Sequence, residues 1–316
     1  MADDSADMHV AALGRKFIGK VASYIKPNTH EASSQAVVMD LADEYDFSHR
    51  SRGIAVIITN SKFEATTQRA GAENDTQLFK EAFKHLGFTD IRVAQDLTAS
   101  EMKWALESIA KDKNVLQNSD CIAIAFSSHG DEQMYIRHDN ASVREDTIFG
   151  TDVPIRTVEL MEIFSDFQCP ELIGKPRLVF VQACRGQKLD RGVEVVKDMD
   201  VTDSIMDVTV SPAPCFKDFL VIYATPPGHF AFRRPAEGSW FVKCLADIMK
   251  LADVEKMSLT KILTRVVSKV ALEYQSGHSD PRLNAKKQSP CFYSMLTKDV
   301  YFRAKHQHKE EPMIVD

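Results

Sequence analysis

The chain has 316 residues, of which 44% are hydrophobic and 27% are charged, so it carries enough apolar material for a large folded core. Its 39 Lys and Arg against 45 Asp and Glu give a net charge of −6, which argues against a nucleic-acid-binding protein. No apolar run approaches the roughly 18 residues that a membrane helix needs. The acidic residues 1–10 do not form a secretory signal. Six cysteines without a C-x-x-C pair predict free thiols in a reducing compartment and no metal site.

Residues 1–46 differ in composition from the rest of the chain. They hold eight acids and four bases and contain no strand-like run, which predicts a flexible leader. The alternative is a short amphipathic helix, because Phe17, Val21 and Tyr24 follow helical spacing. The segment is too short for a separate adaptor domain, since stable domains rarely fall below about 50 residues.

From residue 53 onward, apolar runs alternate with helical patterns. The predicted strands are 54–58, 91–94, 121–126, 178–181, 219–223 and 291–296. The predicted helices cover about 78–86, 98–109, 157–164, 239–251 and 258–274, with a capping box at Thr98 and Glu101 and an N-cap at Thr157. This alternation predicts an α/β fold with a mostly parallel sheet and helices on both faces. Residues 188–217 interrupt it with an acidic loop of functional or disordered character.

Polar side chains follow several of the predicted strands. His129 comes after the strand 121–126, and Gln182 and Cys184 come after the strand 178–181. Arg69 and Arg233 lie in the loops after the first strand and after the strand 219–223. Because ligands of open α/β sheets bind beyond the carboxyl ends of the strands, we expect these residues to gather at one edge.

A cysteine beside a histidine suggests nucleophilic catalysis. A free thiol has a pKa of about 8.5, so a nearby His129 would accept the Cys184 proton and later protonate a leaving amine. The amides of Gly130 and Cys184 would stabilise the resulting oxyanion, each by roughly 3–4 kcal/mol. The alternative is structural, because a cysteine after a strand is commonly a small buried hydrophobic residue.

The run Gln182-Ala183-Cys184-Arg185-Gly186 resembles the signature pentapeptide of the caspase family, in which a His lies about 50 residues upstream. Here His129 precedes Cys184 by 55 residues, within a similar Ser-His-Gly sequence. The blocks at 46–49, 238–241 and 286–291 also resemble caspases, and the resemblance covers about 47–303. The short leader is similar to that of executioner zymogens of the insect type.

This resemblance implies a three-layer caspase-like fold and an aspartate-specific cysteine endopeptidase that acts in apoptosis. By position, Cys184 matches the nucleophile, His129 the general acid/base and Gly130 the oxyanion hole. The residues that match the holders of the substrate's P1 aspartate are Arg69, Gln182 and Arg233. Charged donors suit a desolvated carboxylate, and a neutral P1 residue would leave them unpaired.

The resemblance also indicates the P2 and P4 side of the site. Phe230 and Phe232 stand where the family usually carries Tyr or Trp, and they would form an apolar wall for P2. Arg234 stands where executioner members often carry a neutral polar residue beside the P4 acid. This difference leaves the P4 preference open between an acid and another residue.

Caspases of this type are cut at an inter-subunit linker, which here would be residues 188–217. We expect a large subunit at 47–203, a small subunit at 204–303 and a flexible tail at 304–316. Asp203 ends an acid-x-x-Asp motif and is the predicted cleavage site, in competition with Asp198, Asp200 and Asp207. Asp7 is a candidate site in the leader, with Asp40, Asp43 and Asp46 as alternatives. The alternative interpretation is that residues 188–217 are acidic only because an exposed loop needs soluble residues.

The expected partners are protein substrates, an upstream initiator caspase and inhibitor-of-apoptosis proteins. The expected assembly is a homodimer of large/small heterodimers, paired through the strand 291–296. We expect a cytoplasmic enzyme with no cofactor and no nucleic-acid or membrane partner. The rival hypothesis is a caspase-like decoy or scaffold without catalysis, and the complete set of matching residues favours the enzyme.

Two further patterns are interpreted as coincidences. Residues 14–20 nearly spell a phosphate-binding loop, but Val21 replaces the required Ser or Thr. Asn74-Asp75-Thr76 matches a glycosylation sequon, which has no use in a reducing compartment.

Overall fold

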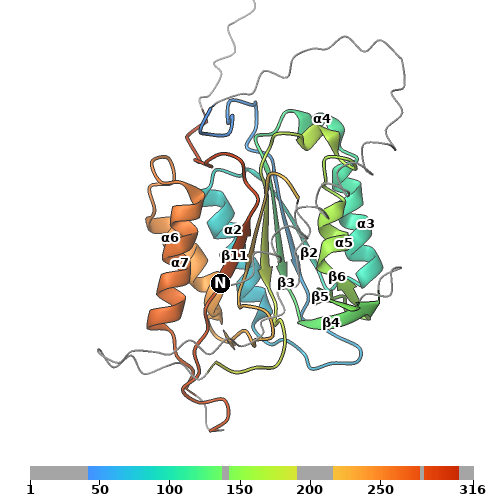
Figure 1. Cartoon of the computed structure of the whole chain (residues 1–316), viewed down its shortest axis with the longest axis vertical. Coiled ribbons are helices and arrows are strands. Elements are labelled where there is room, and N and C mark those ends of the chain that lie inside the picture. The colour runs from blue at the N-terminus through green and yellow to red at the C-terminus, as the bar shows by residue number, and fades with distance from the viewer. Residues whose placement is uncertain (1–41, 137–141, 191–215, 278–280, 306–316) are drawn as a thin grey trace, which may run out of the picture. The chain divides into compact units, whose positions relative to one another are not determined.

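The computed structural model describes residues 42–136, 142–190, 216–277 and 281–305. Its centre is a six-stranded sheet in the order β11-β8-β7-β3-β1-β2 (Figure 1). The strands are β1 (Ile54–Thr59), β2 (Asp90–Gln95), β3 (Ile122–Ser127), β7 (Arg177–Gln182), β8 (Phe219–Tyr223) and β11 (Cys291–Ser294). All neighbours are parallel except β11, which pairs antiparallel with β8 at one edge.

Helices cover both faces of this sheet, which confirms the predicted three-layer α/β class (Figure 1). One face packs against α2 (Ala72–His85), α6 (Trp240–Leu251) and α7 (Leu259–Glu273). The other packs against α3 (Ala99–Ala110), α4 (Lys113–Gln117) and α5 (Thr157–Glu162), with a 3₁₀ turn at Pro170–Leu172. None of the helices in the described ranges is long and apolar enough to span a bilayer.

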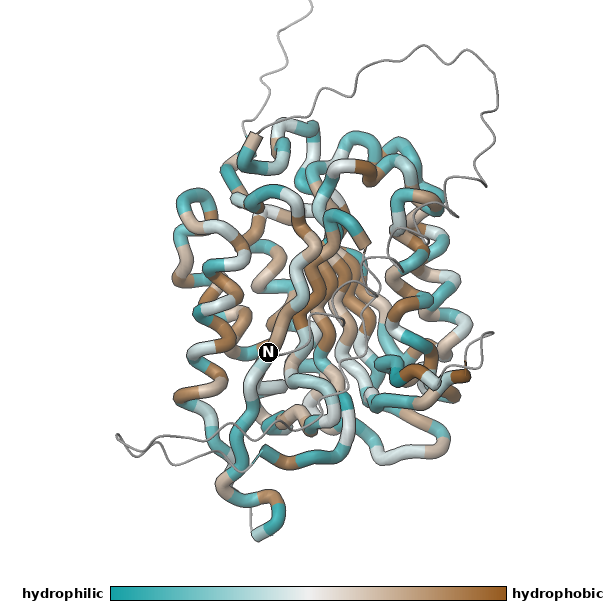
Figure 2. The backbone as a smooth tube through the Cα atoms, viewed as in Figure 1, coloured by the Kyte–Doolittle hydropathy of each residue, from teal (hydrophilic) through white to brown (hydrophobic). Residues whose placement is uncertain are grey.

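The strands separate two hydrophobic clusters. In β1, Ala55 and Ile57 belong to the cluster of α2, α6 and α7, whereas Val56 and Ile58 belong to the cluster of α3 and α5. Successive strand side chains point to opposite faces, so a strand that is covered twice must be apolar throughout. Figure 2 shows this concentration of hydrophobic residues along the central strands. Burial of each large aliphatic side chain contributes about 1.5–3 kcal/mol, which makes the sheet a firm base for the loops at its edge.

Two smaller sheets were not predicted. The first is formed by β4 (Gly130–Ile136), β5 (Ser142–Phe149) and β6 (Pro154–Arg156), and the second by β9 (Arg233–Arg234) and β10 (Gly238–Ser239). The β4 sequence begins Gly-Asp-Glu-Gln, and residues of these types are depleted in strands or have little preference for them. Its strand conformation comes from antiparallel pairing with β5.

The helix N-termini give a mixed result for the predicted caps. The capping box is confirmed, because Glu101 N donates to Thr98 Oγ1 at 3.3 Å and Thr98 N donates to Glu101 Oε2 at 2.9 Å. The cap at Thr157 is wrong, because Arg156 holds the N-cap position and Thr157 is the first helical residue. Arg156 ends β6 and is held by ion pairs, and the helix begins one residue earlier than a cap at Thr157 would give.

Tyr45, near the start of the described chain, joins the residues that flank β8 and β11. Its hydroxyl donates to Asp218 Oδ1 at 2.7 Å and accepts from Thr297 N at 2.9 Å. Burial raises the pKa of Tyr45 to about 12. Asp218 immediately precedes β8, so this contact joins segments on both sides of residues 191–215.

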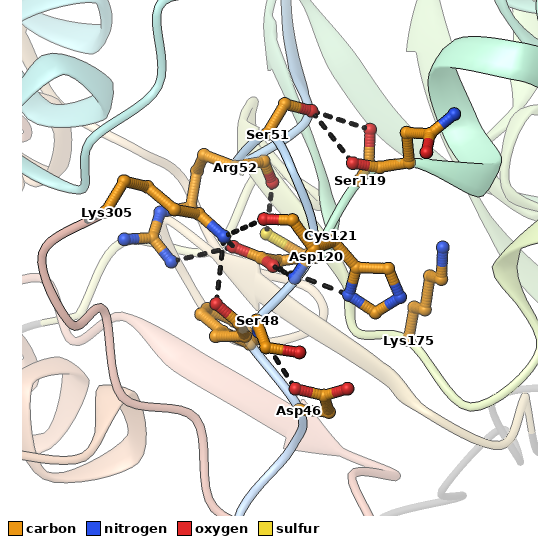
Figure 3. A network of polar contacts seen from close by, with 12 residues as sticks. Asp46, Ser48, Ser51, Arg52, Ser119, Asp120, Cys121, Lys175 and Lys305 are labelled. Carbon is orange, nitrogen blue, oxygen red and sulfur yellow. Dashed lines mark hydrogen bonds and ion pairs between the residues drawn. The ribbon is translucent and has the colours of Figure 1, made fainter. Parts of the chain in front are cut away.

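A second polar cluster lies before the first residue of β3 (Figure 3). The buried Asp120 carboxylate accepts from Arg52 Nη1 at 3.0 Å and from His49 N at 3.1 Å, and it pairs with Lys305. These partners precede β1 or follow β11. The cluster therefore fastens both ends of the described chain to the sheet.

We expect Tyr45→Phe to lower the free energy of unfolding by about 2 kcal/mol, because it removes a buried hydrogen bond to a carboxylate. Urea denaturation followed by circular dichroism measures this change. Tyr301→Phe is the control, since the Tyr301 ring packs against Arg303 at 5.1 Å. Equal losses for the two variants would contradict the role assigned to the Tyr45 hydroxyl.

Candidate active site

The register of the sheet brings three strand ends to the same level. Thr59 of β1 pairs with Ser127 of β3, which pairs with Gln182 of β7. The ladder continues past the strands, because Ser128 N donates to the carbonyl of Gln182 at 3.1 Å. The residues two positions beyond Ser127 and Gln182 are His129 and Cys184. The structure thus places the predicted base and nucleophile on adjacent chain segments at the same edge.

The His129 ring has a defined orientation. Its Nε2 lies 2.7 Å from the carbonyl oxygen of Thr67, and its ring packs against Phe63 with centroids 4.6 Å apart. A carbonyl oxygen only accepts hydrogen bonds, so Nε2 carries the proton and Nδ1 is left as a proton acceptor. Burial lowers the pKa of His129, and the charges of Arg69 and Arg233 lower it further. The imidazole is therefore neutral at neutral pH.

Cys184 is partly buried, and its sulfur faces the backbone of the loop after β8. Ala231 N donates to Sγ at 3.5 Å. Burial raises the pKa of Cys184, although the Ala231 amide and the positive charges of Arg69 and Arg233 act in the opposite direction. The resting group is a thiol, so nucleophilic attack needs a base to take its proton.

Gly130 lies close to the Cys184 backbone. A Cβ at Gly130 would lie 2.7 Å from the Cys184 carbonyl oxygen and 2.7 Å from the Ala183 Cβ, so no larger residue fits without movement. Gly130 is the first residue of β4 and pairs with Ile148 of β5. The backbones of Gly130 and Cys184 therefore lie next to each other.

Arg69 is the most deeply buried cation at this edge, with 4% of its surface exposed. Its Nη1 donates to the Asn60 carbonyl at 2.9 Å, and its Nη2 donates to Ser127 Oγ at 3.0 Å. Burial lowers the pKa of Arg69 to about 10, and the positive charge of Arg233 contributes to this shift. Two guanidinium groups therefore lie close enough to repel each other.

Gln182 and Arg233 each present an unpaired polar atom to this region. The Oε1 of Gln182 and the Nε of Arg233 are buried and have no hydrogen-bond partner among the residues that the structure describes. Burial lowers the pKa of Arg233 from its usual value. An unpaired buried donor is unfavourable, so Arg233 Nε is suited to a negatively charged ligand, whereas Gln182 Oε1 can only accept a hydrogen bond.

Aromatic residues line the strip beside Arg233. The Phe230 and Phe232 rings are 5.3 Å apart, and Phe232 stacks on Trp240 at 4.8 Å. The structure thus brings the two predicted phenylalanines into one apolar wall. Arg234 Nη1 lies 3.2 Å from Glu237 Oε2, so its charge already has a partner.

Three positioning groups were missed by the sequence analysis. Gln288 is buried, accepts from Phe232 N at 2.6 Å and donates to the Ala224 carbonyl at 2.8 Å, which holds the aromatic loop against β8. Asp75 and Ser239 are hydrogen-bonded beneath the arginine pair. Ser239 and Gln288 lie within the sequence blocks 238–241 and 286–291, but Asp75 lies in a sequon pattern that was set aside.

Some predicted positions cannot be placed. Asp203 and Asp7, the predicted processing sites, lie outside the described residues, as do most of the leader and the linker. Within the described ranges there is no group of three or more His, Cys, Asp or Glu side chains that could hold a metal ion.

A thiol and a neutral imidazole that leave neighbouring parallel strands are the arrangement of a cysteine hydrolase built on an α/β sheet. The family model described as "Caspase domain" matches residues 52–301, so the chain belongs to the caspase family. It is accordingly a cysteine-type endopeptidase.

Individual relatives agree with this assignment. Caspase-3 of Bos taurus is 35% identical over 277 residues, which cover 86% of this chain and 92% of the relative. Caspase-7 of Gallus gallus is 33% identical over 276 residues, which cover 85% and 83%. The crystal structure of caspase-1 from Spodoptera frugiperda superposes with a TM-score of 0.70 at 29% identity, covering 84% of this chain and 97% of that one. The similarity to caspase-3 and caspase-7 supports an executioner-type caspase.

We expect alkylation of Cys184 by iodoacetamide to accelerate continuously between pH 6 and pH 9, because burial raises the pKa of its thiol above the usual value. Mass spectrometry of the modified peptide measures the rate at each pH. Cys121 is the internal control, since it is fully buried and should react only on unfolding. A rate that levels off below pH 7 would show a thiolate–imidazolium pair and contradict the neutral resting state.

Proposed function

We propose that the chain is an executioner caspase zymogen that cleaves proteins after aspartate in acid-x-x-Asp motifs and acts in apoptosis. The observation that carries this proposal is the pair of guanidinium groups, Arg69 and Arg233, whose charges act on each other and on Cys184. A buried and a half-buried cation beside a nucleophile would select a substrate with a carboxylate next to the scissile bond.

The proposed reaction begins from the neutral thiol and imidazole. His129 Nδ1 takes the Cys184 proton while Sγ attacks the carbonyl carbon of the P1 residue, and the carbonyl electrons move onto oxygen. The amides of Gly130 and Cys184 hold that oxyanion. As the tetrahedral intermediate collapses, the imidazolium gives its proton to the leaving amine. Water, deprotonated by His129, then hydrolyses the thioester and releases the new carboxylate.

Specificity for P1 aspartate follows from the buried donors. Arg69 and Arg233 would grip the carboxylate from two sides, with Gln182 as a third polar partner. A neutral P1 residue would leave the Arg233 Nε unpaired and the two positive charges without a carboxylate between them, and sites of this kind discriminate by about 10⁴-fold. Phe230 and Phe232 would form an apolar wall beside the P2 residue of the substrate. The ion pair of Arg234 with Glu237 supports only a weak demand for an acid at P4.

The same proposal covers activation and assembly. The large part, 47–203, and the small part, 204–303, share the β7–β8 pairing, which would hold them together after the linker is cut. Tyr45, which precedes the large part, adds a hydrogen bond to Asp218 of the small part as long as it stays attached. Strand β11 is the outer strand of the sheet, which supports pairing of two small subunits there. An upstream initiator caspase, inhibitor-of-apoptosis proteins and a cytoplasmic location rest on the family resemblance.

Cys184→Ala should abolish cleavage of an Asp-Glu-Val-Asp peptide, because no other group supplies the nucleophile. The measurement is fluorogenic peptide hydrolysis, with a positional peptide library on the parent enzyme to test P1 and P4 together. Circular dichroism of the variant should match that of the parent. Residual cleavage equal to the parent's, or a P1 preference other than Asp, would reject the proposal.

Self-processing should release a small subunit that begins at Ser204 and a large subunit that retains Tyr45. Cleavage after Asp46 would detach a side chain that is only 7% exposed and hydrogen-bonded to Asp218, so that site should resist. N-terminal sequencing of both fragments identifies the cuts, and Asp203→Ala should block the first. A large fragment beginning at Phe47, or a small one beginning elsewhere than Ser204, would contradict this prediction.

A further inference from the structure

We infer that Asp75 sets the selectivity for P1 aspartate by holding Arg69 and the β9–β10 ribbon, which carries Arg233, in one fixed geometry. Asp75 is a positioning residue, because it acts through both arginines rather than on the substrate. The inference rests on the proposed function and deepens it.

Asp75 is fully buried in α2, and its carboxylate is held by hydroxyl and amide donors from two other elements. Oδ2 accepts from Ser127 Oγ at 2.7 Å and from Ser239 Oγ at 2.7 Å. Oδ1 accepts from Ser239 N, also at 2.7 Å. Three short bonds to one carboxylate define the relative positions of α2, the end of β3 and the end of β10.

The contact with Ser127 extends to Arg69. Ser127 Oγ donates to Asp75 and accepts from Arg69 Nη2, and the same Nη2 lies 3.7 Å from Asp75 Oδ2. The hydroxyl therefore bridges the carboxylate and the guanidinium. Because Ser127 is two residues before His129, the same bridge also fixes the strand end from which the base projects.

The contact with Ser239 extends to Arg233. Ser239 pairs with Arg233 across the two-stranded ribbon, so anchoring Ser239 anchors the arginine's backbone. The adjacent Gly238 has a φ of +92°, and a Cβ there would lie 3.0 Å from Asp75 Oδ1, which shows how closely the ribbon approaches the carboxylate. Ser239 lies 164 residues after Asp75, beyond the proposed linker.

Charge and geometry predict opposite effects of removing this carboxylate. Asp75 offsets part of the positive charge of Arg69 and Arg233, which otherwise repel each other. If Asp75 acted only as a counter-charge, its removal would make the pocket more positive and would strengthen binding of an acidic P1 residue. If Asp75 positions the two arginines, its removal weakens that binding.

The test is Asp75→Asn in the processed enzyme, assayed with peptides ending in Asp-Glu-Val-Asp and Asp-Glu-Val-Glu. Asparagine keeps the shape but loses the charge and one acceptor. We expect KM for the aspartate peptide to rise about tenfold, the loss typical of one charged hydrogen bond, with kcat changed less than about threefold. The preference for Asp over Glu in kcat/KM should fall about tenfold, because a loosened pair accepts the longer side chain.

Asp120→Asn is the matched control. Asp120 is equally buried and paired, but it lies before the opposite end of β3, against Arg52 and Lys305 (Figure 3). It should lower the thermal unfolding midpoint without changing the ratio of Asp to Glu cleavage. Ser127→Ala should shift the ratio in the same direction as Asp75→Asn, and the double variant should lose less than the product of the two single losses.

An unchanged or lowered KM in a folded Asp75→Asn enzyme overturns the inference, as does an equal effect from Asp120→Asn. If Asp75→Asn does not fold, Ser127→Ala decides the question, and an unchanged Asp/Glu ratio there overturns the inference too. A parent enzyme that does not cleave after aspartate instead rejects the proposed function, so the two failures are distinguishable.

Discussion

Two cations held close together, one buried and one half-buried, are the constraint on which the site depends. Burial lowers the pKa of both Arg69 and Arg233, and the positive charge of Arg233 lowers the pKa of Arg69 further, so both need compensating contacts. Those contacts come from the strand ends and from helix α2. The Asn60 carbonyl, the Ser127 hydroxyl and the Asp75 carboxylate surround Arg69, and the ribbon pairing fixes Arg233.

The site is assembled from both sides of residues 191–215. Arg69, His129 and Cys184 precede this segment, whereas Ala231 and Arg233 follow it. The parallel pairing of β7 with β8 aligns the two parts, and Asp75 and Ser239 tie them together directly below the arginines. A cut in the segment would leave these contacts intact. The fold therefore supports a two-chain enzyme whose pocket is shared between the chains.

The sheet and the site could be predicted from the sequence to different extents. The four central strands were predictable because both of their faces are covered, so each is a continuous apolar run in β1, β3, β7 and β8. The edge of the sheet that holds the candidate site was also predictable, because the predicted site residues follow these strands. The strand β4 was missed because its side chains are polar and only its pairing with β5 makes it a strand. Asp75 was missed because its role depends on hydrogen bonds to Ser239, which lies 164 residues away, and a local sequence pattern cannot predict such a contact. Resemblance to the caspase family identified the arginines, and their roles, like the insect-type detail, stay predictions.

The arginine pair acts on the base and the nucleophile in the same direction. Positive charge lowers the pKa of His129 and also opposes the rise in the pKa of Cys184. When a substrate carboxylate neutralises that charge, both pKa values should rise together. The free energy of proton transfer from sulfur to imidazole depends on their difference and changes little. On the proposed function, the arginine pair would therefore affect which substrate binds rather than how readily the proton moves from sulfur to imidazole.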